Sequence, residues 1–411
     1  MSQIAFQIRQ ILHRMWFLPA AFSLLAVVTV LIAYFLAGFA PEELPFTMPS
    51  NGVEAILTIL ASSLLTVAVF ALSTIVSALS SASQSTTPRA VPLIVGDRHA
   101  QTSISVFIGA FLFSIVGIIG LNTGIYSEAG RLFLSAVTLV VVLLVVMALI
   151  RWIGQISAIG RVSQTVDRVE RATRSAFDTL EEIPQFGCRA LQGEPQGHGL
   201  VAPQLGYVQH FDAARLQELA SEHELVVAVT ARPGAYAAPD RPLLVISRPV
   251  GDKAAEALIG CFTIGDSRTF ESDPRFGMVV LAEIAAKAMS PAVNDPGTAI
   301  DVIGTLVRLL HDREFGPGAA EPQYDRISVV PLNPVDVFED CFRPIARDGA
   351  GTIEVVLRLM EGLRTLAYAN PELAGLAHAT ARDAAERARA ALTAPSDILA
   401  MERAAGFAAE G

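Results

Sequence analysis

Residues 51–85 read NGVEAILTILASSLLTVAVFALSTIVSALSSASQS, an apolar stretch long enough to cross a membrane as one helix. At about 100° per residue, seven of its polar side chains fall on roughly a third of the helix circumference. They are Thr58, Ser62, Thr66, Ser73, Ser77, Ser80 and Gln84. A membrane helix gains nothing by turning such a face toward lipid, so we expect this stripe to face other helices or water.

Two interpretations of the stripe remain open. Ser and Thr let membrane helices approach closely and hydrogen-bond across the contact, so the stripe is first of all a candidate helix-packing surface. Hydroxyl groups from several copies of the same helix also suit the wall of a water-filled pore.

Three further apolar segments surround this one and complete a predicted four-helix transmembrane region over residues 1–154. The four expected spans are 16–39, 53–80, 104–121 and 132–150. Each covers about 20 residues, which is the length that a bilayer requires. No Asp, Glu, Lys or Arg lies near the middle of a span, and this argues against an ion-coupled carrier.

The arginines alternate from loop to loop. Arg9 and Arg14 precede the first span, the first loop has no Lys or Arg, and Arg89 and Arg98 lie in the second loop. Five more arginines occupy residues 151–174, after the fourth span. Basic residues stay on the cytoplasmic side, so both termini are expected in the cytoplasm. The preference for Arg over Lys is typical of a GC-rich bacterial genome, which indicates the bacterial cytoplasmic (inner) membrane.

A juxtamembrane helix is predicted over residues 155–186. Its apolar and small residues recur at alternating steps of three and four, as in a heptad seam. They are Ile159, Val162, Val166, Val169, Thr173, Ala176 and Leu180. The seam fits either a helix that lies on its own cytoplasmic domain or a parallel coiled coil that continues a membrane oligomer.

The rest of the chain predicts an α+β cytoplasmic domain. Residues 187–205 resemble a linker loop, 206–270 a small α/β subdomain, 271–392 a mostly helical subdomain, and 393–411 a tail. Expected strands cover 207–211, 225–230, 243–247, 258–264 and 327–330, and an expected helix follows Asp212. The predicted fold class is therefore a membrane all-α four-helix region followed by an α+β domain.

The charges exclude some function classes. Residues 155–411 hold 35 acidic and 24 basic side chains, so this part is acidic and accounts for the negative net charge of −10. Nucleic acid is not an expected partner, because phosphate binding needs basic patches. Cys188, Cys261 and Cys341 are scattered without metal-site or redox spacing, and we expect them to be buried thiols.

Three stretches resemble a bacterial family of predicted membrane proteins of unknown function. The residues that carry the likeness are Pro88-Arg89, Asp97-Arg98, Gln101, Phe107, Gly109 and Phe111; Arg268-Thr269, Asp273-Pro274 and Phe276-Gly277; and Ser290-Pro291, Asn294-Asp295-Pro296 and Thr298-Ala299. The third stretch, Ser-Pro-x-x-Asn-Asp-Pro-x-Thr-Ala, is the most specific. Residues 286–289 depart modestly from the family pattern. The resemblance implies four spans and a cytoplasmic domain, and it implies no activity.

The Asn294-Asp295 turn is the main candidate site in the cytoplasmic domain. Asp295 is a good helix N-cap before Pro296, and we expect Arg268, Asp273, Asn294, Asp295 and Thr298 to gather at helix ends, where backbone N–H groups favour anions. The cluster is either a ligand- or ion-sensing site or a capped structural turn. A small acidic face, Asp336, Glu339 and Asp340, is expected to be solvated.

No motif of catalysis or of cofactor binding is present. The chain has no His pair at metal-ligand spacing, no Gly-rich phosphate loop and no nucleophile elbow. We therefore expect no enzyme activity, no metal and no cofactor. The favoured function is a homo-oligomeric, channel-like membrane protein whose cytoplasmic domain gates or senses an unidentified small ligand or ion. The alternatives are a membrane-anchored scaffold or sensor without a pore and, less favoured, a membrane-bound enzyme.

Overall fold

The computed structural model describes residues 17–36, 50–95, 98–123, 126, 128–156, 161–316 and 321–409. The chain divides into two compact units. The described parts of 17–84 and 91–164 form the first, called the membrane unit below, and those of 85–90 and 165–409 form the second, the globular unit.

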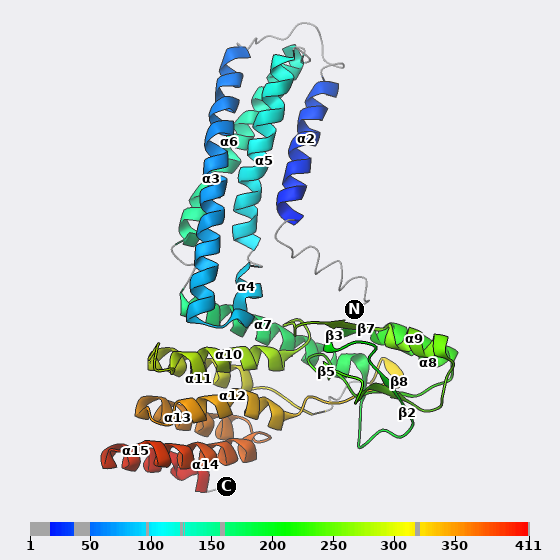
Figure 1. The fold of residues 1–411 in the computed structure, drawn as a ribbon, viewed down its shortest axis with the longest axis vertical. Coiled ribbons are helices and arrows are strands. Elements are labelled where there is room, and N and C mark those ends of the chain that lie inside the picture. Colours follow the sequence, from blue (N-terminus) through cyan, green and yellow to red (C-terminus); the bar gives the residue numbers. More distant parts are fainter. Residues whose placement is uncertain are drawn as a thin grey trace. The chain divides into compact units, whose positions relative to one another are not determined.

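Long helices make up the membrane unit (Figure 1). They are α2 (Phe17–Leu36), α3 (Ser50–Ser85), α5 (Arg98–Asn122) and α6 (Glu128–Ile156), with a short α4 (Val91–Val95) before α5. Three stretches are long and apolar enough to cross a membrane: Gly52–Ser77, Gln101–Asn122 and Gly130–Gly154. In α2 the qualifying apolar stretch, Phe17–Thr29, is shorter than a span. Three of the expected spans are thus confirmed as membrane-capable helices, and the count of four stays a prediction.

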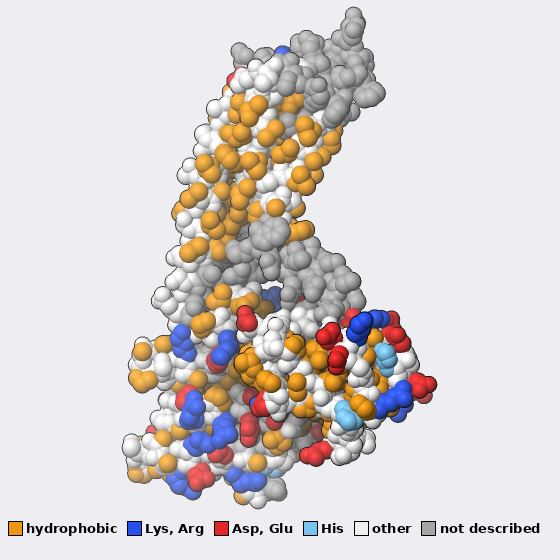
Figure 2. All heavy atoms as spheres, turned by 45° about the vertical axis from the view of Figure 1, so that its right-hand side comes forward, with side chains coloured by type: hydrophobic (Ala, Val, Ile, Leu, Met, Phe, Trp, Pro, Cys, Tyr) orange, Lys and Arg blue, Asp and Glu red, His pale blue; other side chains and the backbone are white. Residues whose placement is uncertain are grey.

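Apolar side chains and close glycine contacts hold the membrane unit together. Leu57 of α3, Phe113 of α5 and Leu134 of α6 belong to one buried cluster. A Cβ atom at Gly117 would lie 3.1 Å from Leu57 Cδ1, so α3 and α5 approach closely there. On the face shown in Figure 2, hydrophobic side chains are spread over the described membrane helices, and most of the charged side chains lie on the globular unit.

Two sheets begin the globular unit. Their strands are β1 (Cys188–Ala190), β2 (His198–Val201), β3 (Gly206–Phe211), β4 (Val227–Val229), β5 (Tyr236–Ala237), β6 (Pro242–Ile246), β7 (Phe262–Gly265) and β8 (Tyr324–Val329). The first sheet has the order β1-β8-β4-β6-β2, with β8 parallel to both of its neighbours and the other pairs antiparallel. The second is antiparallel, in the order β5-β3-β7. Helices α8 (Ala213–Glu222) and α9 (Asp252–Ile259) complete the core.

Several sequence-based boundaries need correction here. The expected linker 187–205 contains β1 and β2, which lack apolar alternation because they are the exposed edge strands of the first sheet. The expected strand 258–264 is wrong in its first half, because Leu258 and Ile259 form the last turn of α9 and only β7 is extended. The subdomain 206–270 is not self-contained either, since β1 and β8 complete its sheet.

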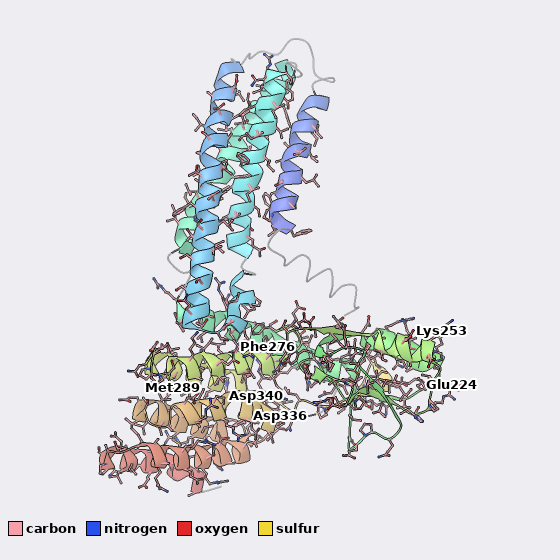
Figure 3. The ribbon with its side chains drawn as sticks, viewed as in Figure 1. Glu224, Lys253, Phe276, Met289, Asp336 and Asp340 are labelled. Atoms are coloured by element: carbon pink, nitrogen blue, oxygen red, sulfur yellow. The ribbon has the colours of Figure 1, made fainter. Side chains whose placement is uncertain are left out.

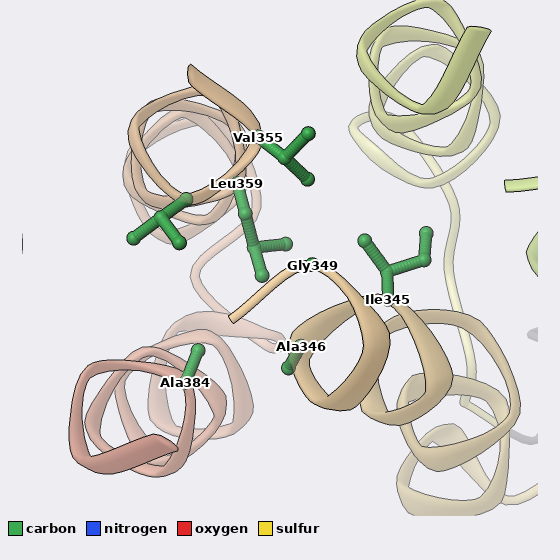
Figure 4. Close-up of a pocket in the computed structure, with 7 residues that line it drawn as sticks. Ile345, Ala346, Gly349, Val355, Leu359 and Ala384 are labelled. Carbon is green, nitrogen blue, oxygen red and sulfur yellow. The ribbon is translucent and has the colours of Figure 1, made fainter. Parts of the chain in front are cut away.

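Three successive layers of helices follow (Figure 1). They hold α10 (Pro274–Ala288) and α11 (Pro296–Leu310), then α12 (Pro334–Asp348) and α13 (Ile353–Ala369), then α14 (Ala374–Ala391) and α15 (Pro395–Ala405). Contacts join each layer to the next, α10 with α12, α11 with α13, α12 with α14 and α13 with α15. A small apolar pocket lies where α12, α13 and α14 meet (Figure 4). The local sequence explains three of the helix starts, because an Asp or Asn cap precedes a proline at the first helical position of α10, α11 and α12. The expected tail 393–411 is mostly helix, and Met401 of α15 is buried.

The juxtamembrane helix α7 (Val162–Glu182) packs on its own globular unit. Val166, Val169, Thr173 and Ala176, four members of the predicted seam, are buried in the single chain. Added atoms at Gly277 of α10 would collide with Thr173, so the two backbones approach very closely. Of the two interpretations of the seam, packing on the globular unit is therefore the one observed. Ile159 lies outside the described residues.

Candidate functional site

The seven residues of the predicted stripe lie on the side of α3 that is turned away from the rest of the membrane unit. All seven are exposed in the single chain. The opposite side of the helix is apolar and buried, and it includes Val53, Leu57, Leu60, Leu64, Ala68 and Ala71. Packing within one chain therefore does not account for the stripe, which is left for lipid, for water or for a second copy.

Hydrogen bonding separates the hydroxyls of the stripe into two groups. Thr58 Oγ1 donates to the Glu54 carbonyl at 2.8 Å and Ser62 Oγ to the Ile59 carbonyl at 3.1 Å, so the first turns satisfy their own hydroxyls. Thr66, Ser73 and Ser77 make no hydrogen bond within the described residues. Two of these, Thr66 and Ser73, lie well inside the apolar stretch Gly52–Ser77.

Hydroxyls that face the interior of the membrane unit behave differently. Ser114 donates to the Ala110 carbonyl at 2.8 Å, and Thr138 donates to the Leu134 carbonyl at 2.7 Å. Both side chains are buried. A buried polar group is costly unless it is hydrogen-bonded, and here each is bonded to its own helix. Within the stripe, Thr66, Ser73 and Ser77 thus carry hydroxyls that donate to no acceptor among the described residues.

The predicted cluster around the Asn294-Asp295 turn is divided between the two ends of α10. Figure 3 shows Phe276 near one end of this helix and Met289 at the other. The helix has 15 residues, so its ends are about 22 Å apart. Arg268 and Asp273 stand at the first end, whereas Asn294, Asp295 and Thr298 follow the second. The expectation that all five residues gather is therefore wrong, because the length of α10 separates them.

At the first end, Asp273 is already fully engaged. Its carboxylate is buried, caps α10 by accepting from the Phe276 amide at 3.2 Å, and receives Arg268 at 2.7 and 3.0 Å. The Arg268 guanidinium also lies 5.3 Å from the centroid of the Phe276 ring. Nearby, Arg275 binds Asp336 and Asp340 at 2.7 and 2.8 Å, so two members of the acidic face expected to be solvated form ion pairs (Figure 3).

At the second end, the turn has the features of a capped connection. Asn294 has a left-handed backbone with φ of 49°, and the Asp295 amide donates to the Ala288 carbonyl at 2.7 Å. Asp295 Oδ1 accepts from the Thr298 amide at 3.2 Å and Oδ2 from the Thr298 hydroxyl at 2.6 Å. These bonds occupy the carboxylate of Asp295 and the hydroxyl of Thr298, whereas the Asn294 side chain is exposed and makes no hydrogen bond to the described residues. The geometry matches the structural interpretation, in which the polar residues satisfy a helix start.

Two features were missed from the sequence. Glu283 of α10 accepts a hydrogen bond from Thr87 Oγ1 at 2.9 Å and forms an ion pair with Arg89. Thr87 and Arg89 directly follow α3, so this carboxylate holds the segment that leaves the predicted second span. The second feature is Arg232, whose Nη1 is buried without a hydrogen-bond acceptor among the described residues. The motif Pro88-Arg89 signalled the first, whereas no pattern in the sequence distinguishes Arg232 from the other arginines.

The three cysteines are buried and are not reactive thiols. Burial raises the pKa of Cys188 and of Cys261 to about 12, and it raises the pKa of Cys341 as well. These thiols stay protonated at neutral pH and are poor nucleophiles. The described residues hold no group of three His, Cys, Asp or Glu side chains that is arranged for a metal ion.

Comparison with known proteins identifies the family of the chain. Residues 13–365 match the family described as predicted membrane protein (DUF2254). The chain belongs to this family. All three stretches that carried the resemblance lie within the matched residues, so the resemblance is confirmed at the level of the family.

Relatives of this DUF2254 protein occur in mycobacteria. The uncharacterized proteins Mb1321c of Mycobacterium bovis and Rv1290c of Mycobacterium tuberculosis are each 24% identical to it over 292 residues. The matched region covers 66% of this chain and 54% of each relative. The chain thus spans about half the length of these relatives. No solved structure matches it.

Proposed function

We propose that this DUF2254 protein is a homo-oligomeric, channel-like protein whose globular unit gates or senses. In the assembly, the hydroxyl stripe of α3 faces the axis, where it either lines water or contacts the stripe of another copy. The observation that carries the proposal is the pair Thr66 and Ser73. Both point out of the single chain, inside an apolar span, with no hydrogen-bond partner among the described residues.

The energetic argument compares lipid with the interior of an assembly. A hydroxyl group without a hydrogen bond in an apolar environment costs roughly 1–3 kcal/mol by mutational measures. Lipid tails offer no acceptor, whereas water or a facing hydroxyl from another copy does. Several such groups on one face therefore favour an assembly in which this face is enclosed.

Contacts in the globular unit support the gating role. Glu283 binds Thr87 and Arg89, which follow α3, and Glu170 on α7 accepts hydrogen bonds from Arg308 at 2.7 and 3.2 Å. α7 begins six residues after α6 ends. A rearrangement of α10 or α11 would thus act on two chain segments that continue into membrane-capable helices.

Two further observations support a proposed location. The relatives are bacterial, and the arginines of the predicted loops alternate in the way that keeps basic loops in the cytoplasm. We therefore propose that the protein lies in the cytoplasmic membrane, with both termini and the globular unit in the cytoplasm. The lipid bilayer and further copies of the chain are its proposed partners, and no catalytic step is assigned.

A second candidate function, a scaffold or sensor without a pore, is favoured by the apolar residues between the hydroxyls. Val69 and Val76 share the exposed side of α3 and are 56% and 58% exposed. Side chains of this kind suit dry helix–helix packing better than a continuous water path. The two candidates predict the same oligomer and differ in whether solutes pass through it.

The test combines cross-linking with flux. If copies meet along α3, Ser73→Cys should form oxidative cross-links between them in native membranes. Such cross-links can be attributed to residue 73, because the three natural thiols are buried. Leu139→Cys on α6, where the leucine is 73% exposed, is the matched control on another apolar surface. Purified protein in liposomes is then assayed for ion or small-solute flux. Cross-links without flux support the scaffold, and Ser73→Cys without cross-links overturns the assembly around α3.

A further inference from the structure

A cleft of about 310 Å³ lies in the globular unit beside the last turn of α7. Its walls come from segments that are far apart in sequence: α7, residues 184–185, the turn at Arg232, residues 314–316 and Leu332 after β8. The volume is at the lower end of what small-molecule sites enclose, which is about 300–1,000 Å³. Phe177, Leu180, Phe315 and Leu332 contribute apolar side chains to its lining.

Arg232 is the cationic group of this cleft. Its Nη1 atom is buried, and no described residue accepts a hydrogen bond from it. Desolvation lowers the pKa of Arg232 to about 10, against a partial opposing effect of the Asp273 charge. The side chain is therefore still protonated at neutral pH. Asp273 does not serve as its acceptor, because that carboxylate binds Arg268 and the α10 amide.

The backbone beneath Arg232 is held in an unusual conformation. Gln185 and Phe186 both have left-handed φ angles, 50° and 60°, and Gly187 follows with 79°. Non-glycine residues in this region are uncommon, and they concentrate at functional sites. Here they place Gln185 in the wall of the cleft and the Phe186 ring 5.9 Å from the Arg232 guanidinium carbon. The guanidinium thus lies over an aromatic ring, while its buried Nη1 has no acceptor among the described residues.

Internal contacts keep the opposite wall in place without a ligand. Arg313 is only 5% exposed and binds Asp178 and Glu181 of α7 at 2.8 Å each. Its guanidinium lies over the Phe177 ring at 5.3 Å, and Phe177 meets Phe315 edge to face with centroids 6.4 Å apart. The cleft is therefore pre-formed, which reduces the ordering cost of binding.

We propose that this cleft binds a small organic monocarboxylate, with its carboxylate at Arg232 and its apolar body against Phe177, Phe315 and Leu332. An arginine fork matches a carboxylate through two parallel hydrogen bonds. Glu182 and Glu314 are exposed lining residues of the same cleft, and their charges oppose a second negative charge on the ligand. A monoanion with an apolar body is thus favoured over phosphate.

This site rests on the proposed function, in which the globular unit senses a ligand, and it gives the chemical class of that ligand. Leu180, Glu181 and Glu182 belong to the last turn of α7 and line the cleft, so a bound ligand adds contacts to the helix that joins the two parts of the chain. Binding is measured on single copies in nanodiscs. Failure of the oligomer or of flux therefore leaves this result unaffected, and failure of binding leaves cross-linking and flux unaffected.

The experiment is calorimetric titration of the full chain in nanodiscs with 3-phenylpropanoate, 4-methylpentanoate and inorganic phosphate. We expect saturable binding of the two carboxylates and weaker binding of phosphate. Arg232→Gln should weaken carboxylate binding by roughly 10–100-fold, because a charge-assisted hydrogen-bonded pair is lost. Arg241→Gln is the control, since Arg241 is exposed and paired with Asp240 outside the cleft. It should leave the affinity within about twofold of wild type.

A second variant tests the cleft independently, in case Arg232→Gln does not fold. Leu332→Trp keeps the arginine and fills the cleft, so it should also abolish carboxylate binding while the circular dichroism spectrum is retained. The proposal is overturned if neither carboxylate binds the wild type, if Arg232→Gln binds as tightly as wild type, or if phosphate binds more tightly than both carboxylates.

Discussion

Arg308 of α11 donates two hydrogen bonds to the Glu170 carboxylate on α7, from Nη2 to Oε2 at 2.7 Å and from Nε to Oε1 at 3.2 Å. The two residues are 138 positions apart in the chain. Glu170 also receives Arg174 at 3.2 Å from one turn farther along α7. Its side chain is only 14% exposed, and the other carboxylates of α7 are all exposed, so Glu170 is the best-shielded acidic residue on the helix that follows the last membrane-capable segment.

The first prediction concerns removal of this charge. Glu170→Gln should lower the free energy of unfolding of the globular unit by about 1–3 kcal/mol, since hydrogen bonds to a charged group are lost and two guanidinium groups remain unpaired. Thermal unfolding of the full chain in detergent measures the change. Glu218→Gln is the matched control, because Glu218 pairs with Arg215 on the surface, and it should change stability by less than about 1 kcal/mol. Equal effects of the two substitutions would contradict a special role for Glu170.

The second prediction is the pH dependence of the same contact. Burial acts to raise the pKa of Glu170, but the hydrogen bonds and charges of Arg308 and Arg174 outweigh it and leave the pKa below its ordinary value of 4.5. The stabilisation is therefore fully present above pH 4.5 and is lost as the pH falls through the lower, folded-state pKa. The stability difference between wild type and Glu170→Gln should shrink below pH 4.5. A difference that stays constant to the acid limit of folding would refute this account.

The third prediction tests how closely α7 lies on α10. A side chain added at Gly277 would collide with Thr173, so Gly277→Ala must push the helices apart. Overpacking of this kind costs typically about 1–3 kcal/mol. Thr173→Ala in the same chain should restore part of the loss. Gly375→Ala on α14, where no atom lies within 4 Å of the added carbon, is the control and should be neutral or slightly stabilising.

Local sequence signals predicted the helix starts, but they did not predict the pairing of strands that are far apart in the sequence. Asp295 before Pro296 marked the start of α11 correctly, because a cap and its helix are neighbours in sequence. The apolar run 258–264 misled the strand assignment, since a short apolar segment carries no period that separates helix from strand. The sheet order joins β8 to β1 and β4 across more than 90 residues, which no local pattern reveals.

The candidate site was predictable in part for the same reason. The stripe on α3 depends only on helical periodicity, so all seven residues share one side of the helix as expected. Whether that side is covered depends on other helices, and the structure leaves it exposed. The expected cluster around Asn294 failed because it needed a distance that the length of α10 forbids. Arg232 went unnoticed because its missing hydrogen-bond acceptor is a property of the folded surroundings.

The fourth prediction addresses Glu283. Replacing it by Ala removes the acceptor of Thr87 and the ion-pair partner of Arg89, so the segment that follows α3 should open more often. Trypsin cleavage after Arg89, followed by mass spectrometry of the full chain in nanodiscs, should then rise roughly tenfold, the effect of losing a charge-assisted bond. Glu256→Ala on the exposed face of α9 provides the control. An unchanged cleavage rate in Glu283→Ala would show that this contact does not hold the segment.

The fifth prediction separates a pore from a dry scaffold at Ser73. A tryptophan there is too large for close helix packing, yet it can project into a water-filled lumen. If α3 lines a pore, Ser73→Trp should keep the oligomer and abolish flux; if α3 packs dry, the same substitution should break the oligomer. Native mass spectrometry reports the assembly and liposome flux reports conduction. Leu139→Trp controls for added bulk at an exposed apolar position of α6. A Ser73→Trp protein with wild-type assembly and wild-type flux would remove α3 from both schemes, because neither a pore wall nor a close helix contact accommodates that side chain unchanged.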